Sequence, residues 1–215
     1  MNQRRKLLKS LAAGSLAAWG MYLEAKGNHP LPPGVRKITG TVAINGATAR
    51  EGQVVLAGDT VSTGDKSEVI YVMGNNAYLM RENTKVSYAA EGVVGVMRVV
   101  TGKILSVFGP GPKRIETSSA TVGIRGTGCY IEAEADKMYF CLCYGSADVT
   151  PLADPTQMKS LLAVHHDTPM FIGQDTSKAL LQQALTINHR DYELALLEAT
   201  VGRVPPFDVN GVNSY

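Results

Sequence analysis

Short stretches in which apolar and polar residues alternate fill the chain from about residue 38 to residue 150. One of them, "ITGTVAI", stops at "NG" (45–46), and another, "EVIYVM", stops at "GNN" (74–76). Alternation with a period of two residues is the pattern of half-buried β-strands, and Asn-Gly favours a hairpin turn. Strands this closely spaced, with no helical pattern between them, predict a mainly β domain with antiparallel pairing, built as a sandwich or a barrel-like stack of sheets.

The pattern changes after Lys159. "SLLAVHHDTPMFIG" predicts a strand, a tight turn at Asp-Thr-Pro and a second strand, so the β domain is expected to span residues 38–174. Two segments with apolar residues near helical spacing follow, and they predict a helical hairpin over 175–202 that is capped at its start by Asp175 or Thr176 and ends at Gly202. The remaining residues, 203–215, have no periodic signal and are expected to form a tail.

The first 25 residues have the composition of a targeting segment, with a basic start and an apolar run from Leu11 to Leu23. The consecutive Arg4 and Arg5, followed by two leucines, resemble the twin-arginine export signal. An ordinary secretory signal and an uncleaved membrane anchor are the alternatives. We expect the periplasm as the location, with contact to the membrane only through this segment if it is not cleaved. A Pro/Gly-rich linker over 26–37 separates it from the β domain.

Two stretches of the β region are similar to the periplasmic FecR domain. The first is "GTVAINGATAREGQVVLAGDTVSTGDKSEVIYV", and the second is "TGKILSVF…KRIETSSATVGIRGTGCYIE", in which Ile-Arg-Gly-Thr (124–127) is the most specific element. The resemblance covers roughly residues 38–150. It implies a β-rich module outside the cytoplasm, and in the best-known members this module relays the state of a receptor to a sigma factor.

This chain departs from that family pattern in two respects. Few residues precede the apolar run at Leu11, so we expect no cytoplasmic sigma-factor-binding region and no transmembrane signalling of the well-known kind. The chain also carries a cysteine cluster that the general pattern does not require. Within the motif, Arg125 lies between two glycines and is expected to be a structural residue of a tight, partly buried bend.

All three cysteines of the chain lie close together, at positions 129, 141 and 143. "GCYIEAE" and "MYFCLCY" predict two strands joined by a turn at 135–137. Residues two apart in a strand share a face, so Cys141 and Cys143 point the same way. Cys129 joins them only if the register is even, because a slip of one residue places it on the opposite face. We expect the register that brings all three thiols together.

Two adjacent histidines, His165 and His166, precede the predicted turn at Asp-Thr-Pro and could point towards the thiols. Thiolates and imidazoles are ligands of zinc, iron and copper, and iron–sulfur clusters use thiolates. The sequence therefore predicts a metal or metal-cluster site built from the following residues: Cys129, Cys141, Cys143, His165 and His166. The alternatives are one disulfide with a leftover thiol, and three buried, inert cysteines. His189 lies between the predicted helices and is treated as incidental.

Three functions remain open. The favoured one is an exported, non-catalytic binding, sensor or scaffold protein with a metal or cofactor site, whose partner is another envelope protein. The second is a protein-interaction module with structural cysteines. The third is a thiol-disulfide oxidoreductase that uses Cys141-Leu142-Cys143, although no thioredoxin-like βαβ pattern surrounds it. The net charge of +2, with Lys and Arg spread along the chain, does not indicate a nucleic-acid site, and no catalytic constellation is expected.

The export hypothesis is tested by changing Arg4 and Arg5 together to lysine. We expect the variant to accumulate in the cytoplasm, because the twin-arginine receptor reads the consecutive arginine pair. Cell fractionation and immunoblotting measure the distribution. Unchanged export of the double variant would show that another route reads this segment.

Overall fold

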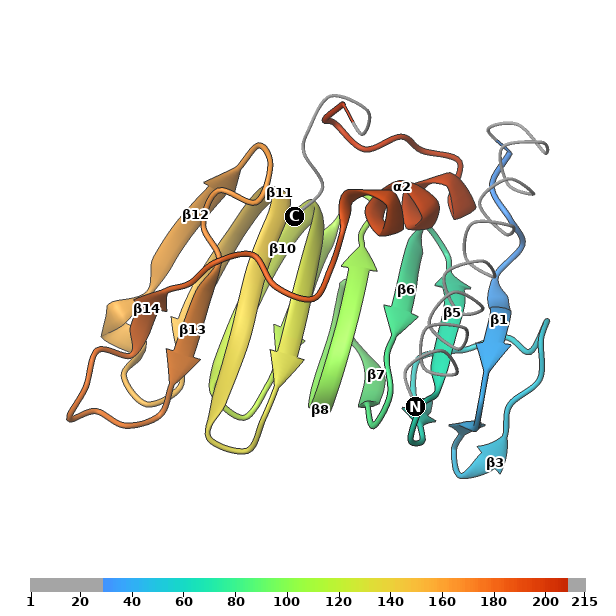
Figure 1. Ribbon diagram of the computed structural model, residues 1–215, viewed down its shortest axis with the longest axis horizontal. Coiled ribbons are helices and arrows are strands. Elements are labelled where there is room, and N and C mark those ends of the chain that lie inside the picture. Colours follow the sequence, from blue (N-terminus) through green and yellow to red (C-terminus); the bar gives the residue numbers. More distant parts are fainter. Residues whose placement is uncertain (1–28, 209–215) are drawn as a thin grey trace, which may run out of the picture.

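The computed structural model describes residues 29–208, so the predicted export signal and the end of the tail lie outside the described residues. The described part is mainly β, with one α-helix, α2, and one short 3-10 helix, Pro155–Gln157 (Figure 1). The first seven strands are β1 Gly34–Thr39, β2 Val42–Ile44, β3 Ala47–Thr48, β4 Thr60–Thr63, β5 Glu68–Met73, β6 Asn76–Met80 and β7 Lys85–Glu91. The remaining elements are β8 Val94–Val107, β9 Pro112–Glu116, β10 Ala120–Ala133, β11 Lys137–Pro151, β12 Lys159–Ala163, β13 Met170–Gly173, β14 Leu181–Gln183 and α2 Asp191–Thr200.

All fourteen strands belong to one mixed sheet that is not closed. Three long strands, β8, β10 and β11, pair with different neighbours along their two halves. The second half of β8 pairs with β6 and β10, whereas its first half pairs with β7 and with β9, the latter in parallel. The sheet therefore has two arms, and these three strands run through both. The helix-side arm has the order β14-β13-β11-β10-β8-β6-β5-β1, and the far arm has the order β12-β11-β10-β9-β8-β7-β4-β2-β3.

The long strands bend where they pass from one arm to the other. In β10 the register shifts between Arg125 and Cys129, and Gly126 there has a φ of 56°. The next glycine, Gly128, has a different role, because a Cβ at this position would lie 2.4 Å from the ring of Tyr144 on β11. The Gly-Thr-Gly segment thus supplies both the backbone conformation of the bend and the room for a buried tyrosine.

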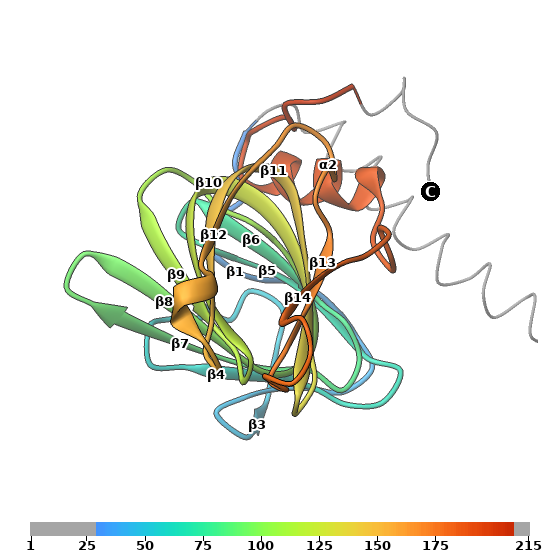
Figure 2. The ribbon, with the colours of Figure 1, turned by 90° about the vertical axis from the view of Figure 1, so that its left-hand side faces the viewer.

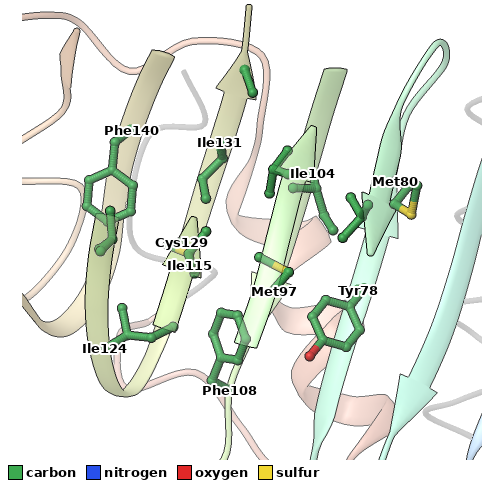
Figure 3. Packing of buried hydrophobic residues seen from close by; sticks show 14 of the residues in the cluster. Tyr78, Met80, Met97, Ile104, Phe108, Ile115, Ile124, Cys129, Ile131 and Phe140 are labelled. Atoms are coloured by element: carbon green, nitrogen blue, oxygen red, sulfur yellow. The ribbon is translucent and has the colours of Figure 1, made fainter. Parts of the chain in front are cut away.

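The space between the two arms holds the main hydrophobic core. Figure 3 shows side chains from β6, β8, β9, β10 and β11 meeting there, with Cys129 among them. Ile104, Ile115 and Ile131 in this core are all fully buried. Figure 2 shows the sheet curving around this core, with α2 outside it.

The outer face of the helix-side arm is also buried, because α2 and the chain that leads to it lie across it (Figure 1). Leu194 and Leu197 of α2 are fully buried in a second apolar cluster, where they meet residues of β5, β6, β8, β10 and β11. Near α2 the two ends of the described chain meet, since the Leu31 amide donates a hydrogen bond of 2.8 Å to the Thr200 carbonyl. The strands of this arm are therefore apolar on both faces, which explains uninterrupted apolar runs such as "VIYV".

The structure confirms the mainly β prediction, but it does not confirm a sandwich of separate sheets. Antiparallel pairing holds for the described strands except the β8–β9 pair. The predicted linker over 26–37 contains the start of β1, because Gly34 and Val35 pair with Val72 and Tyr71 on β5. The conformation of Gly34, with a φ of 117°, lets the strand begin beside the 52–53 backbone.

The predicted helical hairpin over 175–202 is not confirmed. Only its second half is helical, and that helix ends next to Gly202 as expected, with Gly202 at a φ of 71°. In the first half, β14 pairs with β13, which buries Leu180 fully and leaves Leu185 82% exposed. The edge strand β13 forms backbone hydrogen bonds with β14 in this segment. This pairing stabilises the extended chain more than the helical spacing of the leucines would stabilise a helix.

The segment around Arg125 was expected to be partly buried, and it is, since Ile124 and Thr127 are buried whereas Arg125 and Gly126 are exposed. The bend itself was correctly expected. Within the described residues, the helices are too short or too polar to cross a membrane.

The packing of α2 predicts a large difference between two leucine substitutions. Leu197→Ala removes a fully buried side chain and is expected to lower the free energy of unfolding by about 2–5 kcal/mol. Leu185→Ala, at an exposed position, is expected to change it by less than about 0.5 kcal/mol. Chemical denaturation followed by circular dichroism measures both. Equal effects of the two variants would contradict the observed docking of α2.

Candidate functional site

The β10–β11 hairpin places Cys141 and Cys143 on the outer face of the helix-side arm. Cys141 lies opposite Tyr130 in the register, and both cysteines are fully buried in the apolar cluster beneath α2. The two residues are separated by Leu142, whose side chain lies in the inner core. The prediction that Cys141 and Cys143 share a face is confirmed.

Cys129 is not brought to this group. It pairs with Leu142 in the hairpin register and lies in the inner core, on the opposite face of the sheet from the other two cysteines. The expected even register is therefore wrong, because the hairpin turns over only two residues, 135–136, with the Glu134 amide bonded to the Lys137 carbonyl, and this turn pairs Cys129 with Leu142. Burial among apolar side chains raises the pKa of the Cys129 thiol, as expected for an inert core cysteine.

His166 lies in the loop between β12 and β13, directly beside the cysteines. Its backbone has a φ of 53°, and its amide donates a hydrogen bond of 2.9 Å to the carbonyl of Cys143. Asp167 holds the loop, because one of its carboxylate oxygens accepts hydrogen bonds from the amides of Val164 and His165. The imidazole of His166 then lies with Nδ1 3.4 Å from Cys141 Sγ.

His189, which the sequence did not single out, is the fourth member of the group. It precedes α2, is 4% exposed, and stacks on the ring of Tyr130 with a centroid distance of 4.5 Å. Its Nε2 lies 3.1 Å from Nδ1 of His166. No motif in the sequence marks His189. It reaches His166 only because an extended segment takes the place of the first predicted helix.

Four potential ligand atoms thus lie within 4.8 Å of one another. We refer to the residues that carry them as the Cys/His cluster: Cys141, Cys143, His166 and His189. All four side chains are buried. They come from β11, from the β12–β13 loop and from the segment before α2, so the cluster joins three separate parts of the chain.

Asp191, in the first turn of α2, contacts both predicted histidines. Its Oδ1 lies 3.0 Å from Nε2 of His166 and 2.9 Å from Nε2 of His165. His165 therefore points to the carboxylate and not to the thiols. The predicted His165 lies beside the cluster without belonging to it, although His165, His166 and Asp191 form a second, overlapping group of possible ligands.

The hydrogen bonds around the cluster determine where the protons of the two clustered imidazoles lie. The Ile187 carbonyl can only accept, so Nδ1 of His189, at 2.7 Å, donates to it. The Asp191 carboxylate likewise accepts from Nε2 of His166. In neutral rings, the lone pairs on Nε2 of His189 and Nδ1 of His166 then face each other at 3.1 Å. A proton or a metal cation between them would remove the repulsion of the two lone pairs.

Interactions within the cluster also shift the pKa values of its two thiols and of His166. A hydrogen bond from the Cys143 thiol is the main cause that lowers the pKa of Cys141, and hydrogen bonds to His166 and His189 add to it. Burial and the neighbouring Cys141 raise the pKa of Cys143. The pKa of His166 is raised: burial opposes this, but the hydrogen bonds and charges of Cys141 and Asp191 outweigh it. Cys141 is thus favoured as a thiolate, the form that binds metals.

Two ionic groups fix α2 above the cluster. Nη2 of Arg81, on the segment after β6, lies 2.9 Å from Oε1 of Glu193 and donates to the Asn188 carbonyl at 2.8 Å. Farther along the helix, Glu198 accepts hydrogen bonds from the hydroxyl of Tyr144 and from Nε of Arg203. Glu193 and Glu198 are nearly fully buried, so loss of either arginine would leave a buried charge without its partner.

No protein family and no curated protein matches this chain, so the FecR resemblance remains a prediction. Among the solved structures that are similar to part of this chain are two of one protein. Both are crystal structures of a "putative anti-sigma factor" from Parabacteroides distasonis ATCC 8503, at 1.65 and 2.50 Å resolution. Each is 14% identical, with a TM-score of 0.49, over 58% of this chain and 59% of the solved chain. The chain thus spans about three fifths of each solved chain.

The burial of the thiols predicts their reactivity. Cys129, Cys141 and Cys143 are each fully buried, so the folded protein should not react with a thiol reagent such as DTNB on the time scale of minutes. All three thiols should react after unfolding in guanidinium chloride with a chelator present. Absorbance at 412 nm follows the reaction. Rapid labelling of the folded protein at Cys141 or Cys143 would contradict the buried cluster.

Proposed function

We propose that this protein is an exported, non-catalytic β protein that binds one transition-metal ion in the Cys/His cluster and acts as a sensor or scaffold. The arrangement of hydrogen bonds around the cluster carries this proposal. Asp191 and the Ile187 carbonyl each bind the outer nitrogen of a clustered imidazole, so the inner nitrogens face the thiols as acceptors. Histidines that ligate metals are usually oriented in this way by a carboxylate or carbonyl on their other nitrogen.

The distances favour a single ion. Nitrogen and sulfur ligands of one tetrahedral zinc ion lie roughly 3.3–3.8 Å apart, as follows from Zn–N bonds of about 2.0–2.1 Å and Zn–S bonds of about 2.3 Å. The distances of 3.4 Å between Cys141 Sγ and His166 Nδ1 and of 3.1 Å between the two imidazoles are close to this range. Two cysteines and two histidines in tetrahedral geometry are typical of zinc, whereas copper and iron also accept this ligand set.

An iron–sulfur cluster fits the site less well. Clusters with four cysteine ligands are excluded, because only Cys141 and Cys143 lie at the site. In Rieske-type clusters two cysteines bind one iron and two histidines bind the other. A thiolate and an imidazole as close as Cys141 and His166 correspond to ligands of the same ion.

The position of the cluster supports a structural or sensory role. A site with four protein ligands has no open position for a substrate, which is typical of structural zinc. A bound ion would join β11, the β12–β13 loop and the start of α2, because each contributes at least one ligand. Binding would therefore stabilise α2 on the sheet, and loss of the ion would loosen it. A change in the exposure of α2 is a signal that a partner protein could detect.

The location and the partner follow from the N-terminal sequence. Export by the twin-arginine route carries folded proteins, so a metal bound in the cytoplasm would protect the thiolates from the oxidising periplasm. We propose a periplasmic protein whose partner is another envelope protein and whose only membrane contact is the N-terminal segment, if this is retained.

Thiol-disulfide exchange is the less favoured function. A redox cysteine must be reached by the thiol or disulfide of its substrate, and Cys141 and Cys143 are fully buried beneath α2.

Metal content tests the proposal. Protein purified from the periplasm without added metal is expected to contain about one equivalent of a transition metal by inductively coupled plasma mass spectrometry. Cys141→Ala, Cys143→Ala, His166→Ala and His189→Ala should each remove most of it, since each deletes one ligand. Asp191→Asn should weaken metal affinity by about 10–100-fold, because it removes the negative charge that orients His166.

Cys129→Ala is the matched control, because it removes a buried thiol from the same hairpin on the opposite face. This variant should keep its metal. Metal-free wild-type protein that also binds no added Zn²⁺ or Cu²⁺ would refute the proposed function, as would equal metal loss in the Cys129 and Cys141 variants.

A further inference from the structure

A cavity of about 470 Å³ lies where the two arms of the sheet diverge, and none of the residues of the Cys/His cluster lines it. We call it the arm cavity. Its walls come from both arms and from the loop after β3. The residues that matter for its chemistry are Val54, Leu56, Tyr78, Tyr88, Phe108 and Lys113. Its size lies within the range of about 300–1,000 Å³ that is usual for small-molecule sites.

One wall of the arm cavity is aromatic. The ring of Tyr78 lies 5.5 Å from that of Tyr88 and 5.8 Å from that of Phe108, measured between centroids. Figure 3 shows Tyr78 and Phe108 side by side on this face. The hydroxyl of Tyr88 has a partner in the hydroxyl of Tyr71. The hydroxyl of Tyr78, in a side chain that is only 3% exposed, has no hydrogen-bond partner within residues 29–208.

Lys113 brings a positive charge to the same cavity. It lies on β9 two residues before Ile115 and opposite Ile124 of β10, and both isoleucines are buried in the inner core. Lys113 is therefore on the inward face of the strand. Its neighbour on β8 is Gly95, where a Cβ would lie 3.3 Å from Lys113 Cδ, so the missing side chain leaves room for the lysine stem.

The ammonium group of Lys113 has only backbone partners among the described residues. Nζ lies 3.3 Å from the carbonyl oxygens of Pro110 and Gly111, with no carboxylate in contact within residues 29–208. Partial burial lowers the pKa of Lys113. The adjacent Arg114, by contrast, is paired with Glu91 and Glu116. Lys113 is partly buried, and its ammonium group lies at the open side of the cavity without a carboxylate partner, so an anion beside the apolar wall would be stabilised there.

We propose that the arm cavity binds a small amphipathic carboxylate, with its apolar body against the aromatic wall and its acidic group on Lys113 Nζ. The hydroxyl of Tyr78 supplies a further hydrogen bond to the ligand. Val54 and Leu56, which are 49% and 61% exposed, extend the apolar surface at the cavity wall. This site is independent of the Cys/His cluster, because the cluster lies on the outer face of the sheet.

Octanoate and 1-octanol serve as probes, since they share a chain length and differ in charge. Isothermal titration calorimetry on the full chain should show octanoate binding at one site, and 1-octanol binding at least about tenfold more weakly. Lys113→Met keeps the apolar stem and removes the charge, so it should weaken octanoate binding by about 10–100-fold and leave 1-octanol unchanged. Lys113→Arg should retain most of the octanoate affinity.

Further variants test the Tyr78 hydroxyl and the cavity space separately, and two more serve as controls. Tyr78→Phe should weaken octanoate binding by about 2–10-fold, because it removes only the hydroxyl. Ala90→Trp, which fills the cavity, should abolish binding of both probes. Lys85→Met, at an exposed position on the same arm, is the control and should bind octanoate like the wild type. Cys141→Ala should also bind octanoate normally, so failure of the metal proposal would not affect this result.

Three results would overturn the proposal. The first is the absence of octanoate binding to wild-type protein at millimolar concentration. The second is equal affinity for octanoate and 1-octanol that Lys113→Met does not change, which would indicate a neutral apolar ligand or a partner's side chain. The third is octanoate binding that survives Ala90→Trp, which would place the ligand elsewhere.

Discussion

The pairing of three bent strands with two sets of neighbours is the constraint on which the rest of the structure depends. Since β8, β10 and β11 each take part in both arms, the inner core and the outer apolar cluster are built from alternate residues of the same strands. The position of the bend in β10 sets which residues face which way. The turn between β10 and β11 pairs Cys129 with Leu142, so Cys129 lies in the inner core, while Cys141 and Cys143 face α2.

This arrangement gives the two faces of the sheet different chemistry. The inner face is apolar except near the open end of the arms, where Tyr78 and Lys113 line a cavity. The outer face carries thiols and imidazoles, and it is closed by a helix that two buried glutamates fix to the sheet. Buried ion pairs of this kind favour one docking geometry, because separating the partners would leave a buried charge uncompensated.

Much of the fold could be predicted from the sequence, because alternation and turn residues act locally. The turn between β10 and β11 and the shared face of Cys141 and Cys143 follow from spacing alone. The face of Cys129 did not follow, since a change of one residue in the length of the predicted turn at 135–137 moves Cys129 to the other face. The leucines near 180–187 have helical spacing, yet the open edge of β13 pairs with this segment instead. His189 was missed for the same reason, because its partners lie more than twenty residues away and meet it only through this extended segment.

The hydrogen bond between Leu31 and Thr200 has a consequence for biosynthesis. The segment before β1 is bonded to the end of α2, and the helix covers strands that are synthesised about a hundred residues before it. The outer cluster therefore cannot close while the ribosome still holds the C-terminal segment. Nascent chains would expose the apolar outer face of β5 and β6 until α2 has left the ribosome.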